Sequence, residues 1–151
     1  MDTDQTYRLH QSLGYQLSLT ARLQERRFEE QLKTLGLTRI TWCILLAVRV
    51  EGLKHPSDIA GFVGVDRTAT SRALRQMEVA GMIERKGGKV DGRTTLVGLT
   101  GRGDDLLAQA TPMARSNARH WQDKLTGPEA REMRRLMAKL RHGEDAALKQ
   151  L

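Results

Sequence analysis

Apolar residues recur at roughly helical spacing over the first 35 positions of the chain. They stand at Tyr7, Leu13, Leu17, Leu23, Phe28, Leu32 and Leu35. Gly36 follows where a left-handed C-terminal cap belongs. The pattern predicts one long helix of about 40 Å at about 1.5 Å per residue. Because such a helix is too long to be buried within so small a monomer, we expect it to need a partner surface.

Two shorter helices are predicted next. Thr38 caps a helix that is almost entirely apolar over residues 40–50 and is closed by Gly52, and a helix that is apolar on nearly every side is buried. We expect it at the centre of the core. Pro56 suits the first position of a short third helix, PSDIAGFVG, because its missing N–H costs nothing there.

The fourth predicted helix has two distinct faces. Asp66 is a favourable N-cap, and the helix runs to about Ala80 before Gly81 ends it. Its inner face has 3-4-3 spacing and consists of Thr70, Ala73, Leu74 and Met77. Its outer face is polar and cationic: Arg67, Thr68, Ala69, Ser71, Arg72, Arg75 and Gln76. Two short helices joined by a tight turn, the second with such a face, are typical of a helix-turn-helix.

After Gly81 the pattern changes from helix to strand. The run 82–86 and the run 94–99 flank a basic tip, GGKVDGR, which contains an Asp-Gly turn. This arrangement predicts a β-hairpin. A hairpin with a basic tip directly after a recognition-type helix is a wing.

Two long amphipathic helices complete the prediction. Thr100 caps the fifth, whose apolar positions are Leu106, Leu107, Ala110, Met113, Ala114, Trp121 and Leu125. Thr126 and Glu129 form a T-x-x-E capping box for the sixth. The sixth is expected to carry Met133, Leu136, Met137, Leu140 and Leu148.

Composition narrows the classes of function. The chain has 151 residues, which favours one domain, and 25 basic against 18 acidic side chains give a net charge of +7. Residues 61–102 are the most basic part, with eight basic and four acidic side chains. This balance favours a polyanionic partner. With 39% hydrophobic and 28% charged residues and strong periodicity, a membrane protein and a disordered chain are both excluded. We see no targeting segment, and one cysteine makes no internal disulfide, so we expect a cytoplasmic protein.

Enzymatic and metal chemistry find little support in the sequence. No Gly-rich phosphate loop, nucleophile elbow or paired-carboxylate motif is present, and no histidine pair has the spacing of metal ligands. Cys43 lies in the apolar run beside Trp42 with no Lys, Arg or His nearby in the helix to lower its pKa, which favours an inert, packed thiol. We therefore expect neither an enzyme nor a metal or other cofactor.

From Gly36 to about Leu107 the chain resembles the MarR/SlyA type of bacterial transcriptional regulators. LTRITWCILLAV is similar to the family's "LT…QW…L" helix, and DIAGFVGVDRTATSRALRQMEVAGMIER is similar to its helix-turn-helix. KVDGRTTLVGLTGRGDDLL resembles its wing, with the D-x-R motif and the following helix start. The chain departs from the pattern at Arg39-Ile40-Thr41, where the family has a glutamine, and at Gly87-Gly88, which loosens the strand before the wing.

The resemblance implies a mainly α (α+β) fold, a winged helix-turn-helix with about six helices and long terminal dimerisation helices. Residues 37–100 would be the DNA-binding domain, and residues 1–36 and 101–151 the helical dimerisation region. A homodimer of this kind binds a pseudo-palindromic operator and is commonly released by a small aromatic or phenolic effector. Tyr15, Arg22 and Trp42 are the candidate effector-binding residues.

The expected DNA contacts divide into two kinds. Thr68, Ala69 and Ser71 are short enough to let the helix enter the major groove, and helical N–H groups there meet phosphate. The longer Arg72, Arg75 and Gln76 lie behind them, and Arg85 and Lys86 are expected to contact phosphate. By the resemblance, Asp91 orients Arg93 into the minor groove. Arg67 and Lys89 complete the set.

We therefore predict a sequence-specific DNA-binding regulator, a homodimeric repressor that responds to a small molecule. Two alternatives remain open. One is a winged-helix module that contacts proteins and does not bind DNA, which would need no cationic recognition face. The other is a regulator that senses oxidants through Cys43.

Overall fold

The computed structural model describes residues 6–87, 95–149 and 151. Its elements, in chain order, are a 3-10 turn η1 (Leu9–Gln11), α1 (Leu13–Lys33), α2 (Arg39–Arg49), α3 (Pro56–Val63), α4 (Arg67–Val79), β1 (Ile83–Lys86), β2 (Leu96–Leu99), α5 (Gly101–Gln122) and α6 (Gly127–Arg141). The predicted mainly helical fold with one β-hairpin is confirmed.

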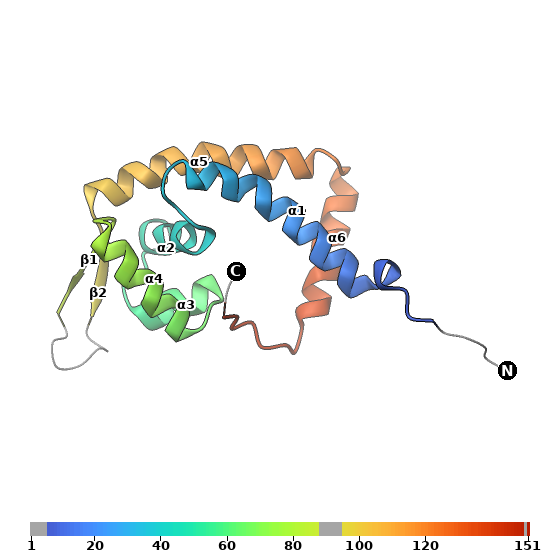
Figure 1. Ribbon diagram of the computed structural model, residues 1–151, viewed down its shortest axis with the longest axis horizontal. Helices are drawn as coiled ribbons and strands as arrows, with labels where there is room; N and C mark the ends of the chain where they lie inside the picture. The colour runs from blue at the N-terminus through green and yellow to red at the C-terminus, as the bar shows by residue number, and fades with distance from the viewer. Residues whose placement is uncertain (1–5, 88–94, 150) are drawn as a thin grey trace.

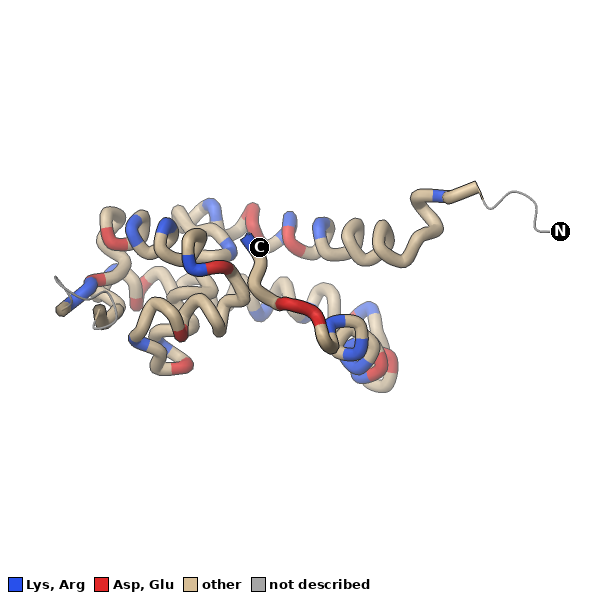
Figure 2. The backbone as a smooth tube through the Cα atoms, turned by 90° about the horizontal axis from the view of Figure 1, so that it is seen from below, with Lys and Arg blue, Asp and Glu red and all other residues tan. Residues whose placement is uncertain are grey.

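The two longest helices, α1 and α5, lie against each other and form one layer of the molecule (Figure 1). The helices α2, α3 and α4 and the hairpin pack together beneath one end of this layer, and α6 follows α5 at the other end. Figure 2, turned by 90°, again places the start of α1 at the end of the long axis farthest from the hairpin. The helix-turn-helix and the hairpin thus share one end of the molecule.

The first helix is shorter than predicted. The apolar spacing suggested a helix that included Tyr7, whereas α1 begins at Leu13. Ser12 has an extended backbone, and its hydroxyl accepts a hydrogen bond from the Tyr15 N–H at 3.2 Å. A serine that caps a helix stops it from extending further toward the N-terminus, so the preceding residues form only the short turn η1.

The core lies around α2, as predicted. Thr38 and Thr41 cap α2 reciprocally, and Ile44, Leu45 and Ala47 in this helix are fully buried. The same cluster includes Phe28 and Leu32 from α1, and Leu106, Leu107 and Ala110 from α5. One continuous core therefore joins the long helices to the helix-turn-helix.

The helix-turn-helix has the predicted capping. Pro56 begins α3, Gly64 ends it at φ +79°, and Asp66 caps α4 by accepting the Ala69 N–H at 2.8 Å. All four predicted inner-face residues of α4 are buried: Thr70, Ala73, Leu74 and Met77. Packing of this face fixes the direction in which the outer face of α4 points.

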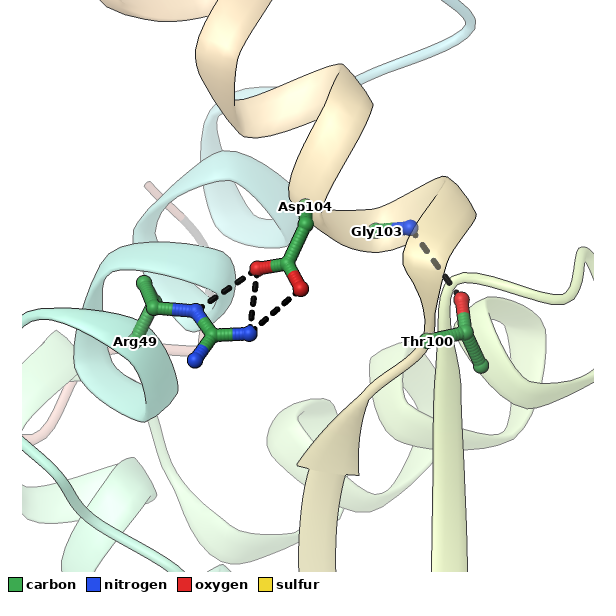
Figure 3. Close-up of polar contacts among 4 residues, drawn as sticks. All are labelled: Arg49, Thr100, Gly103 and Asp104. Carbon is green, nitrogen blue, oxygen red and sulfur yellow. Dashed lines mark hydrogen bonds and ion pairs between the residues drawn. The ribbon is translucent and has the colours of Figure 1, made fainter.

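The hairpin leads directly into α5. Strands β1 and β2 are antiparallel, with Ile83 opposite Leu99. Thr100 caps α5 by accepting the Gly103 N–H at 3.1 Å. One turn along, Asp104 is paired with Arg49 at the end of α2, with Nε donating to Oδ1 at 2.6 Å (Figure 3). These contacts attach the base of the wing to the core and to the long helix.

The sixth helix has the predicted capping box but ends earlier than predicted. Thr126 and Glu129 cap each other, and α6 stops at Arg141, two residues before Gly143 at φ +82°. Leu148 was expected on this helix, but it lies beyond it and forms a parallel bridge with Val65. Of α6, which is described in full, only Ala130 is buried. None of the helices in the described ranges is long and apolar enough to cross a membrane.

Candidate nucleic-acid interface

The outer face of α4 is a row of accessible polar and cationic side chains. Ala69 and Ser71 are half-buried, and the others are exposed: Arg67, Thr68, Arg72, Arg75 and Gln76. All seven come from a helix whose opposite face is buried in the core. The structure therefore brings together the helical part of the predicted interface.

The N-terminal end of α4 is already partly occupied. The Asp66 carboxylate accepts the Ala69 N–H, and the Asp66 N–H donates to the carbonyl of Leu148 at 2.6 Å. We predicted that helical N–H groups here would meet a phosphate. Within the free chain these two amides have protein partners instead.

Arg85, on β1, forms an ion pair with Glu78 of α4. Its guanidinium donates through Nε and Nη2 to the carboxylate of Glu78 at 2.9 and 3.3 Å. These hydrogen bonds raise the pKa of Arg85 and lower the pKa of Glu78 below its usual value. Arg85 therefore connects the wing to the C-terminal end of α4, in addition to any contact that it makes with DNA.

The remaining predicted wing residues are seen only in part. Lys86 is exposed, and its Nζ lies 3.3 Å from Oε1 of Glu84 on the same strand. Lys89, Asp91 and Arg93 lie outside the described residues. Their predicted contacts at the hairpin tip therefore remain predictions.

A cavity of about 330 Å³ borders one side of α4. Its walls come from four parts of the chain: Glu29 of α1, residues 38–41 at the start of α2, the residues Ala69, Arg72, Ala73 and Gln76 of α4, and Lys149 with Leu151 near the C-terminus. Three predicted interface residues, Ala69, Arg72 and Gln76, thus also line a cavity that the C-terminal segment helps to close.

The three candidate effector residues lie apart along α1 and α2. Tyr15 is half-buried and stacks on His10 at 4.8 Å, whereas Arg22 is exposed. Trp42 is half-buried and meets Phe28 edge to face at 4.8 Å. They line neither the cavity beside α4 nor a second one next to the turn between α3 and α4.

Three buried side-chain atoms of α1 and α2 lack a hydrogen-bond partner among the described residues. One of them, Nη1 of Arg39, is ion-paired with Glu25 at 2.8 Å. The other two are Nε1 of Trp42 and Oε1 of Gln31. An unpaired buried donor or acceptor is costly and asks for an explanation, such as a missing ligand or water. Sequence reasoning missed Gln31, since a glutamine on an amphipathic helix has no signal that separates it from a solvated one.

Cys43 has the properties of an inert thiol. Burial raises its pKa, and Arg39, one turn earlier on α2, lowers it by a smaller amount. We had expected no cation nearby in the helix, so Arg39 corrects that expectation without reversing the outcome. A reactive cysteine needs a lowered pKa. In the described part of the chain, no three His, Cys, Asp or Glu side chains are placed to hold a metal ion.

The comparisons with known proteins agree with this geometry. Residues 35–94 match the model of the MarR family. The HTH-type transcriptional repressor Mb2911 of Mycobacterium bovis is 30% identical over 129 residues, which are 85% of this chain and 92% of that protein. The chain belongs to the MarR family. As a member of this family it is a DNA-binding transcriptional regulator.

Solved structures show that this MarR-family chain has the fold of its relatives. A mutant MarR of E. coli, crystallised with operator DNA, superposes with a TM-score of 0.75 at 24% identity, over 85% of this chain and 92% of that one. The organohalide-sensing RdhR-CbdbA1625 regulator, bound to 2,4-dichlorophenol, superposes with a TM-score of 0.81 at 20% identity, over 95% of this chain and 86% of that one.

Proposed function

We propose that this MarR-family chain acts as a homodimeric repressor that reads an inverted-repeat operator with α4 and the wing. The observation that carries the proposal is the outer face of α4, seven predicted contact residues on a helix held rigidly by its buried inner face. A positioned helix with short polar side chains near its N-terminus and cations behind them suits insertion into the major groove. The 30% identical relative is named a repressor.

The dimer would form through the two ends of the chain. Leucines of α1 and apolar residues of α6 are exposed: Leu13, Leu17, Leu23, Met133, Leu136 and Leu140. A row of exposed apolar side chains on two long helices favours a second copy as its cover. On this proposal residues 1–36 and 101–151 serve dimerisation, and residues 37–100 serve DNA binding.

Selection of duplexes from a random library, followed by titration at several salt concentrations, tests the proposal. Arg72→Ala is expected to weaken binding to every duplex and to reduce the salt slope by about one, because a phosphate contact carries no sequence information. Thr68→Ala or Ser71→Ala should instead change base preference at particular positions, by roughly 1 to 3 kcal/mol.

Arg115→Ala is the control, since it removes an exposed arginine of α5 and should leave both quantities unchanged. If Arg72→Ala, Thr68→Ala and Ser71→Ala all bind like the wild type, α4 is not the reading element. If the chain enriches no duplex, the proposed operator binding is wrong, and a winged-helix module that contacts proteins becomes the better account.

We propose further that a small aromatic acid or phenol releases the operator by binding between α1 and α2. The support is two buried polar atoms without a hydrogen-bond partner, the donor Nε1 of Trp42 and the acceptor Oε1 of Gln31, together with the contact of Trp42 with Phe28 of α1. A phenolic hydroxyl can accept a hydrogen bond from Nε1 of Trp42 or donate one to Oε1 of Gln31, whereas a carboxylate can only accept from Nε1. An apolar ring would pack beside Trp42 and Phe28. Tyr15 lies about 20 Å from Phe28 along α1, at about 1.5 Å per residue, so a small effector beside Trp42 does not reach it. Arg22 remains a predicted contributor from α1.

Calorimetry with salicylate-like acids, with and without operator duplex, tests this effector. Tenfold release requires about 1.4 kcal/mol of coupling, and the duplex must weaken effector binding by the same factor. Trp42→Phe keeps an aromatic ring and removes the indole N–H, so it should weaken the acid without weakening DNA binding. Equal binding with and without duplex, or no binding at millimolar concentration, would contradict the proposal.

A further inference from the structure

We propose that the C-terminal strap, residues 144–149 with Leu151, is an autoinhibitory segment that competes with DNA for the N-terminal end of α4. This inference rests on the proposed DNA binding and adds a form of regulation within the chain. After α6 ends at Arg141, the chain turns back toward the helix-turn-helix (Figure 1). Residues 145–147 border a cavity with α3, and Lys149 and Leu151 border one with α4.

The strap is joined to the turn between α3 and α4 through the main chain. The Leu148 N–H donates to the carbonyl of Gly64 at 2.9 Å, and the Leu148 carbonyl accepts the Asp66 N–H at 2.6 Å. The two hydrogen bonds flank Val65, which is buried. Because they involve main-chain atoms, they hold the strap in place although the Leu148 side chain is half exposed.

The strap and the DNA would use the same residues. Asp145, Ala146 and Ala147 border a cavity together with residues 64–67, and this set includes Arg67. Lys149 and Leu151 border the other cavity, together with Ala69, Arg72 and Gln76. Four of the seven predicted contact residues of α4 thus face the strap. A duplex that approached this end of α4 would meet the strap first.

The charge of the strap adds little to the steric conflict. The strap begins with Glu144 and Asp145, which appear as the acidic stretch between α6 and the C-terminus in Figure 2. Lys149 follows them and borders the cavity beside Arg72 and Gln76, so residues 144–149 carry a net charge of −1. The docked strap therefore excludes the duplex mainly by volume, and DNA binding requires the strap to leave.

The size of the effect follows from how long the strap stays docked. Two main-chain hydrogen bonds, less the cost of ordering the segment, favour docking modestly. If the strap is docked about four fifths of the time, only one fifth of the molecules are competent, and the apparent affinity for DNA falls about fivefold. Release of the strap should recover this factor.

Two variants test the strap at one position. Leu148→Pro removes the N–H that donates to Gly64, while Leu148→Ala keeps both main-chain hydrogen bonds and removes only a half-exposed side chain. With a duplex selected from a random library, Leu148→Pro and a chain that ends at Gly143 should bind about fivefold more tightly than the wild type. Leu148→Ala should bind within twofold of the wild type.

Hydrogen exchange provides a readout that does not depend on affinity. The Leu148 amide should be protected in the free wild-type chain and lose that protection when the selected duplex saturates it. Unchanged affinity in Leu148→Pro and in the shortened chain, or a Leu148 amide still protected on DNA, would overturn the inference and leave the proposed function standing. The selection of duplexes from the random library is run with both the full chain and the shortened chain. If only the shortened chain enriches a duplex, the strap inhibits DNA binding completely. Enrichment by neither would refute the proposed function and, with it, the inference.

Discussion

Single residues at the base of the wing show how tightly α5 is fixed to the hairpin. A Cβ added at Gly103 would lie 2.1 Å from the carbonyl oxygen of Met82, which is a backbone atom and not the end of a flexible side chain. The same carbonyl accepts the Thr100 N–H at 3.1 Å. Glycine is therefore needed at position 103 because the Met82 carbonyl leaves no space for a Cβ. The φ angle at this position does not itself require glycine.

Replacement of Gly103 by alanine is expected to lower the free energy of unfolding by about 2 to 3 kcal/mol, because the new methyl group forces the start of α5 away from the hairpin. Gly101→Ala is the matched control, since a Cβ there meets nothing within 4 Å; it should change stability by at most about 0.5 kcal/mol. Urea unfolding measures both. If the two substitutions changed the free energy of unfolding equally, the contact with the Met82 carbonyl would not be the cause of the loss of stability.

The pair of Glu78 and Arg85 predicts a dependence on pH. Hydrogen bonding to Arg85 lowers the pKa of Glu78 in the folded chain below its ordinary value of 4.5. A carboxylate with a lowered folded pKa stabilises the fold fully above its unfolded pKa, and the contribution disappears as the pH falls through the folded pKa.

Glu78→Gln should accordingly be less stable than the wild type at pH 7, and the difference should shrink toward zero as the pH falls below about 4.5 and through the lowered folded pKa. Because Glu78 is on the surface, we expect a small difference. Chemical unfolding at a series of pH values measures it, with Glu51→Gln, an exposed residue two positions after the end of α2, as the control. A difference that stays constant with pH would show that the ion pair does not stabilise the wing.

Among the elements, α1 and α6 are amphipathic helices whose apolar side chains are left uncovered. Leu13 is 62% exposed and Leu140 is 50% exposed, values far from those of core leucines. Helices of this kind gain their stability from packing of the apolar face and not from intrinsic propensity. A second copy of the chain would supply that packing.

Leu136→Asp places a carboxylate in the middle of the exposed apolar side of α6 and is expected to weaken dimerisation by about 100-fold or more, since a buried unpaired charge is strongly unfavourable. Ala138→Asp adds the same group toward the opposite side of the helix and should leave the dimer intact. Light scattering reports the mass: about 34 kDa for a dimer of the 17.0 kDa chain. A wild-type chain that stays at 17.0 kDa at micromolar concentration would contradict the proposed dimer.

For the whole molecule, what could be predicted from the sequence was mostly local. The caps at Asp66, Thr100 and Thr126 depend on residues three positions apart, and all three form as predicted. The inner face of α4 follows from spacing alone. The apolar spacing of α1 continued back to Tyr7, but Ser12 caps the helix, so α1 begins at Leu13.

Features that depend on tertiary contacts were missed. Leu148 continued the apolar period of α6, but Gly143 ends that helix in the left-handed region, and the strap then pairs with a turn more than 80 residues earlier in the chain. Arg85 reaches Glu78 only because the turn at Gly81 folds the hairpin back onto α4. Gly143, after two cations in the last turn, was an available signal for the end of α6.

The most direct test of the account is a hydroxyl-radical footprint of the wild-type chain on the duplex it selects. Two copies of α4 related by a two-fold axis should protect two inverted half-sites whose centres are about one helical turn apart, roughly 10 to 10.5 base pairs. Arg72→Ala should require more protein to give the same footprint. A single protected site without inverted symmetry, or protection spread evenly along the duplex, would contradict a dimer that reads DNA with α4.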